Sequence, residues 1–69
     1  MQLYRFEVTT DDGDFDVVIC AKSDEHAFEL VEIEIEKHVS KSVDIIDISL
    51  FEKKNIRGGA GFVIEKHDR

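Results

Sequence analysis

The stretch "KKNIRGGAGF" (Lys53–Phe62) is the part of this sequence whose composition comes closest to a phosphate-binding loop. It places three cations and three glycines within ten residues. A Walker-type loop needs the pattern GxxxxGK[ST] between a strand and a helix, and a dinucleotide fingerprint needs GxGxxG in the same context. Here "GGAG" is followed by the strand-like run "FVI" and by no Lys-Ser or Lys-Thr pair. Both motifs therefore fail.

Three interpretations of this stretch remain open. The side chains of Lys53, Lys54 and Arg57 could gather at the tip of a loop, where the backbone of Gly58 and Gly59 allows close approach, and bind a phosphate or nucleotide. The same cations could instead contact an acidic surface of a protein partner. The simplest alternative is a connection between two strands whose charges are solvated.

The acidic run "DDGDFD" raises the question of a calcium site. An EF-hand loop needs oxygen ligands at positions 1, 3, 5 and 12. Counting from Asp11 puts Gly13 at position 3, Phe15 at position 5 and Lys22 at position 12. Because the spacing fails, we expect a turn with solvated carboxylates and no metal.

The histidines and the cysteine offer no stronger chemistry. Glu34 and His38 are four residues apart on an expected helix, but a zinc site needs three or four ligands and no second pair has ligand spacing. Cys20, the only cysteine, has no histidine base marked by a sequence signature. We therefore expect no metal, no cofactor and no enzymatic activity.

The charge distribution limits the partners. Residues 1–36 hold eleven Asp and Glu against two Lys and Arg, a net charge of −9, whereas residues 37–69 have a net charge of +2. The acidic half disfavours general binding to nucleic acids or anionic membranes. No apolar run is longer than five residues and no signal core follows Met1, so we expect a cytoplasmic protein that does not cross a membrane.

The elements that position these residues begin with an expected hairpin. Asp12-Gly13 lies between "LYRFEVTTD" and "DFDVVICA", and an Asp-Gly pair suits the two positive φ values of a type I′ turn. A two-residue loop at this point predicts that Val8 faces Val17 and that Phe6 faces Ile19. The apolar positions of both strands then share one side of the ribbon.

A helix is expected over "SDEHAFELVEIEIEKHV". Ser23 is a suitable N-cap, Asp24 and Glu25 lie in the first turn, and Lys37 and His38 lie in the last turn, as the helix dipole favours. The alternative is a strand, because "VEIEIE" alternates with a period of two.

Two further strands are expected, in "SVDIIDISLFEKK" and "GFVIEKH". The predicted fold is a single α+β domain over residues 1–69 with the order ββαββ. Four strands form a mostly antiparallel sheet in the order 2-1-3-4, and the helix packs on one face. The predicted core consists of Tyr4, Phe6, Val8, Val17, Ile19, Ala27, Phe28, Leu30, Val31, Ile35, Ile46, Ile48, Leu50, Phe62 and Ile64.

One helix leaves the other face of the sheet uncovered. That face is predicted to carry Leu3, Val18, Cys20, Ile45, Phe51 and Val63. A chain of this length buries a thin core, and a single cysteine cannot form an internal disulfide, so a second copy is a reasonable source of stability. We expect a non-enzymatic interaction module that forms a homodimer; the alternative is a small protein that binds an anionic ligand at residues 53–62.

The segments "LYRFEV", "DDGDFDVVICAKSDEHAFEL" and "EKKNIRGGAGFVIEK" resemble a family of short uncharacterised proteins from Bacillus-type bacteria. The resemblance covers nearly the whole chain. It implies a cytoplasmic bacterial protein with a compact α+β fold, and it transfers no functional residue.

Overall fold

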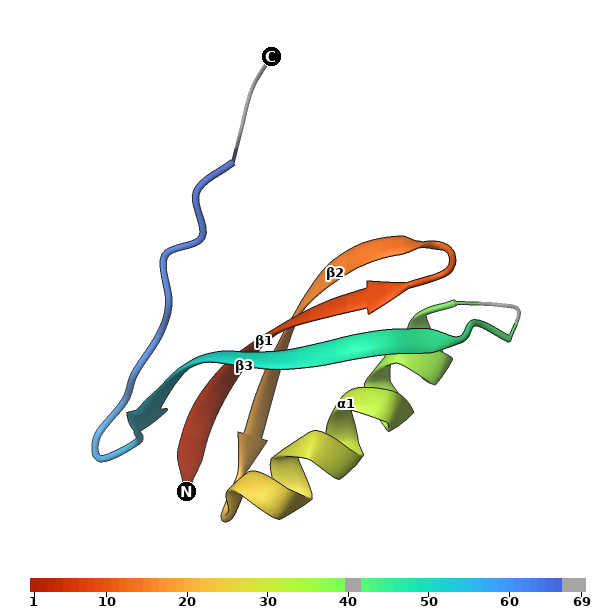
Figure 1. Cartoon of the computed structure of the whole chain (residues 1–69). Helices are drawn as coiled ribbons and strands as arrows, with labels where there is room; N and C mark the ends of the chain where they lie inside the picture. Colours follow the sequence, from red (N-terminus) through yellow and green to blue (C-terminus); the bar gives the residue numbers. More distant parts are fainter. Residues whose placement is uncertain (40–41, 67–69) are drawn as a thin grey trace.

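The fold is a three-stranded antiparallel sheet with one helix on one face (Figure 1). The computed structural model describes residues 1–39 and 42–66. The elements, in chain order, are β1 (Gln2–Thr10), β2 (Gly13–Ala21), α1 (Asp24–His38) and β3 (Ile45–Asn55). The strand order is β2-β1-β3, so β1 is the central strand. The α+β class is confirmed, and the prediction of four strands is wrong.

The expected fourth strand is absent from the described part of the segment. Residues 61–66 belong to no strand, and His67 lies outside the described residues. After β3 the chain passes through Gly58 and Gly59, whose φ angles of 87° and 129° are accessible mainly to glycine. Figure 1 shows the chain turning there and running away from the sheet. Residues 61–66 therefore have the sequence pattern of a strand but pair with no strand of the described chain.

The hairpin between β1 and β2 forms with a different register from the predicted one. Phe6 pairs with Val17 and Tyr4 pairs with Ile19, two residues away from the expected partners. Because side chains alternate with a period of two, a shift of two residues leaves every side chain on its predicted face. The assignment of faces survives although the register prediction was wrong.

The turn itself explains the shift. Its two central residues are Asp11 and Asp12, and neither has a positive φ, which rules out a type I′ turn. Gly13 takes the positive φ of 120° as the first residue of β2. The Thr10 hydroxyl accepts a hydrogen bond from the Asp12 N–H (3.0 Å) and donates one to the Gly13 carbonyl (2.7 Å). Thr10 is buried, and these two bonds satisfy the hydrogen-bonding capacity of its hydroxyl.

Helix α1 begins as predicted at Ser23. The Ser23 side chain accepts a hydrogen bond from the His26 N–H (3.1 Å), and its extended backbone (φ −141°, ψ 159°) is that of an N-cap. Ala27, Val31 and Ile35 recur every four residues and are buried against the sheet, which settles the ambiguity of "VEIEIE" in favour of helix. No helix in the described ranges is long and apolar enough to cross a membrane.

Two irregularities in β3 change which of its residues face the helix. Thr9 pairs with Asp47 and Thr10 with Ile45, so Ile46 is an extra residue without a partner on β1. This bulge turns Ile45 toward the core and leaves Ile46 exposed, contrary to the prediction for both residues. Phe51 is the extra residue of a second shift, between the pairs Arg5–Glu52 and Phe6–Leu50.

The core lies between α1 and the face of the sheet that α1 covers. The buried apolar residues on that face come from β1 and β2. The core confirms most of the predicted positions, but Phe28, Ile46 and Ile64 are exposed and Leu30, Ile48, Leu50 and Phe62 are only half-buried. Phe28 nevertheless meets Phe6 edge to face, with ring centroids 4.9 Å apart. The buried apolar residues are Tyr4, Phe6, Val8, Val17, Ile19, Ala21, Ala27, Val31 and Ile35.

Replacing Ile35 by alanine is expected to lower the free energy of unfolding by about 2–5 kcal/mol, because a large apolar side chain is lost and a cavity remains. Ile35 is 2% exposed. A core of this size rarely supplies more than about 3–5 kcal/mol. The Ile35→Ala chain should therefore be largely unfolded at room temperature, as measured by urea titration followed by circular dichroism.

Ile33 is the matched control for this prediction. It is an isoleucine in the same helix but is 44% exposed. Ile33→Ala should cost about 1 kcal/mol or less. Equal midpoints of unfolding for the two variants would contradict the assignment of the buried helix face.

Candidate interaction surface

The side of the sheet that faces away from α1 is formed by alternate residues of all three strands. We call it the open face. Strand pairing places its members opposite one another, as in the pairs Glu7–Asp16 and Glu7–Ser49. Its residues are Leu3, Arg5, Glu7 and Thr9 of β1, Asp14, Asp16, Val18 and Cys20 of β2, and Asp47, Ser49, Phe51, Glu52 and Lys54 of β3.

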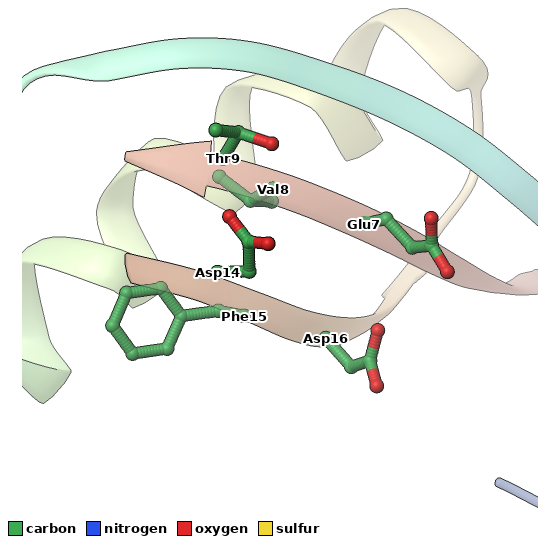
Figure 2. Close-up of a pocket in the computed structure, with 6 residues that line it drawn as sticks. All are labelled: Glu7, Val8, Thr9, Asp14, Phe15 and Asp16. Carbon is green, nitrogen blue, oxygen red and sulfur yellow. The ribbon is translucent and has the colours of Figure 1, made fainter. Parts of the chain in front are cut away.

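The end of the open face near the β1–β2 turn is acidic. Glu7, Asp14 and Asp16 contribute three carboxylates around a shallow depression of about 230 Å³, and Thr9 lies beside them (Figure 2). Within the ranges that the structure describes, no group of three or more acidic, histidine or cysteine side chains is arranged to hold a metal ion. The three carboxylates give this end of the open face a negative potential.

The other end of the open face carries its exposed apolar residues, with Glu52 and Lys54 beside them on β3. Val18 is 46% exposed, Phe51 is 58% exposed and Cys20 is an exposed free thiol, while Leu3 is half-buried. Three residues of the predicted interface, Val18, Cys20 and Phe51, thus do share this face. The other two do not: Ile45 lies on the helix side, and Val63 lies in the segment beyond the sheet.

Arg5 lies between the two ends. The carbon at the centre of its guanidinium is 4.6 Å from the centroid of the Phe51 ring, and its Nη2 is 3.8 Å from Asp16 Oδ2. The side chain is 13% exposed, and its Nε has no hydrogen-bond partner within the described part of the chain. The Arg5 guanidinium therefore makes a cation–π contact with the Phe51 ring that helps to hold the ring on the open face.

The two lysines of the glycine-rich stretch do not converge. Both belong to β3, where successive side chains point to opposite faces. Lys53 points to the helix side and pairs with Asp24 (Nζ–Oδ1 3.0 Å). Lys54 points to the open face, donates to the Gly61 carbonyl (2.7 Å) and lies 5.0 Å from the centroid of the Phe62 ring.

The remaining members of the predicted anion site lie beyond the strand. Arg57, Gly58 and Gly59 are exposed in the turn after β3. Arg57 forms no hydrogen bond or ion pair with residues 1–39 or 42–66. Anion binding at this stretch stays a prediction.

A cluster that sequence reasoning missed joins three elements on the helix side. The Tyr4 hydroxyl donates to Asp24 Oδ1 (2.8 Å), and Lys53 Nζ donates to the same oxygen (3.0 Å) and to Oδ2 (3.3 Å). It links β1, the first turn of α1 and the end of β3. No local pattern could have revealed it, because its members are 20 and 29 residues apart.

The cluster moves two pKa values in opposite directions. The hydrogen bond from Lys53, together with the one from Tyr4, lowers the pKa of Asp24. Burial of the phenol, followed by its bond to Asp24, raises the pKa of Tyr4. Tyr4 thus stays protonated and Asp24 stays ionised at neutral pH, which makes the cluster a structural tie rather than an acid–base pair.

Lys53→Met is expected to raise the pKa of Asp24 toward its ordinary value, since the largest cause of the lowering is removed. A lowered pKa in the folded chain means that ionised Asp24 adds stability above its ordinary pKa of 3.8, and that this stability is lost as the pH falls through the lowered value. The variant should lose less stability on acidification. NMR titration of the Asp24 carboxyl and urea midpoints at several acidic pH values measure both effects.

Lys54→Met is the control, because the neighbouring side chain points to the opposite face. It should leave the pKa of Asp24 unchanged. If both substitutions moved that pKa equally, a general charge effect and not the Lys53 contact would be responsible.

Comparison with known proteins finds a family but no characterised relative. A family model described as "Protein of unknown function (DUF3906)" matches residues 1–64. No curated protein and no solved structure matches the chain.

Proposed function

The chain belongs to this family of unknown function, and we propose that it is a non-enzymatic interaction module that self-associates through the apolar end of its open face. The observation that carries the proposal is the exposure of Val18, Cys20 and Phe51 together on the face that α1 leaves uncovered. Apolar groups gathered on a small domain are typical of a protein contact.

The accessible surface of the chain is larger than that of a compact monomer of its mass. The chain exposes 5158 Å², whereas a compact monomer of 7.9 kDa is expected to expose about 4,400 Å². This excess includes the exposed segment after Gly59, which runs away from the sheet (Figure 1). A second copy could bury this surface and add to a core that is thin for the length of the chain.

The acidic end of the open face favours one arrangement of the two copies. If two open faces met with their acidic ends in contact, Glu7, Asp14 and Asp16 of both copies would repel one another. A two-fold axis near Val18 and Phe51 brings the apolar ends together and keeps the acidic ends apart. Charge then sets the orientation, and apolar contact supplies the affinity.

The alternative function, binding of a phosphate or nucleotide at residues 53–62, has less to support it. Lys53 is engaged by Asp24 and Lys54 by Gly61, and their side chains lie on opposite faces of β3. The cytoplasm of a Bacillus-type bacterium, which the resemblance implies, is the proposed setting for the interaction module.

Val18→Lys is expected to weaken self-association at least tenfold, since it places a charge among the apolar side chains of the contact. Val18 is exposed in the single chain, so the substitution should leave the fold intact. Sedimentation velocity over a wide range of protein concentration measures the change. A wild-type chain that stays monomeric at high concentration would refute the proposal.

Thr9→Lys is the matched control. It introduces the same side chain on the same face, but at the acidic end. In the proposed arrangement it should change the dissociation constant less than threefold. A loss equal to that of Val18→Lys would place the contact elsewhere on the face.

A further inference from the structure

A second uncovered surface lies on the helix side of the sheet. Helix α1 packs mainly against β2 and leaves β3 beside it partly bare. The resulting depression, which we call the α1–β3 groove, has a volume of about 530 Å³. Its apolar lining consists of Phe28, Ile33 and Ile48, and its acidic lining consists of Glu29, Glu32 and Glu36.

The groove adjoins a sheet edge that is free. In the order β2-β1-β3, one side of β3 pairs with β1 and no strand of the described chain pairs with the other side. Such an edge presents backbone N–H and C=O groups that can accept an added strand.

The segment formed by residues 61–66 has the pattern of such a strand. It belongs to no helix or strand in the single chain, and Val63 is 91% exposed. In an extended chain, Phe62, Ile64 and Lys66 share one side. Two apolar residues followed by a cation match a groove whose lining holds three apolar residues and three carboxylates.

We propose that residues 61–66 of one copy pair with the free edge of β3 in a second copy, placing Phe62 and Ile64 in the α1–β3 groove and Lys66 beside its carboxylates. The inference rests on the proposed function only in taking a second copy as the partner, and the contact that it adds does not involve the open face. The occupant is a second copy because the chain turns at Gly58 and Gly59, and the Lys54–Gly61 bond holds the segment on the open-face side. Figure 1 shows it leading away from α1.

Cross-linking between two differently substituted chains tests this contact. In a Cys20→Ser background, one chain carries Ile64→Cys and the other carries Ile33→Cys, which is exposed and lines the groove. Each chain then has a single thiol, so every disulfide that forms must join two copies. Under mild oxidation of the mixture, we expect the mixed dimer in at least tenfold excess over that given by Val63→Cys with the same partner, because Val63 lies on the other side of the segment.

The outcomes separate this inference from the proposed function. The mixed cross-link should persist when both chains also carry Val18→Lys, since the open face is not part of this contact; its loss in that background would overturn the inference. Equal cross-linking by Val63→Cys would overturn it as well. So would a disulfide that forms within a single chain carrying both cysteines and never between copies. If Val18→Lys did not weaken self-association but the mixed cross-link still formed, the contact through residues 61–66 would be supported and the contact through the open face would be refuted.

Discussion

The fold depends on one side of the central strand. Tyr4, Phe6 and Val8 point to the same side of β1 and are almost completely buried. Strands β2 and β3 flank β1, and α1 packs over this side of the sheet. A strand has two sides, however, and the chain supplies one helix of 15 residues. The other side of β1 must meet solvent or another molecule, and it accordingly carries charged and hydroxyl residues near the turn. The open face is therefore a direct result of building so small a protein around a central strand.

Signals that act over a few residues could be predicted from the sequence. The alternation of apolar residues in β1 and β2 and the capping hydroxyl of Ser23 determine local structure directly, and the helix formed where expected. The register was missed because it depends on the two hydrogen bonds of the Thr10 hydroxyl, for which the Asp-Gly pair gave a misleading signal. The fourth strand was predicted wrongly, because a strand pattern cannot reveal whether the segment reaches and pairs with a neighbouring edge.

The candidate surface was predictable only where alternation stayed regular. Val18 and Cys20 share a face because they are two residues apart in an unbroken strand, and Phe51 joins them at a bulge, where Arg5 holds its ring. Ile45 changed sides because another bulge adds a residue, which no local pattern announces. Lys53 and Lys54 appeared to be loop residues, but β3 continues to Asn55 and so separates their side chains.

The two bulges in β3 also limit how this protein can aggregate. A long, flat edge can add copies without end and grow into a fibril, whereas each bulge interrupts the ladder and increases the local twist. Between Ile46 and Phe51 only a few residues remain regular, and charged residues at Asp47 and Glu52 flank them. An edge interrupted in this way offers a short stretch of regular backbone to an added strand and is a poorer template for a continuous ladder than a flat edge.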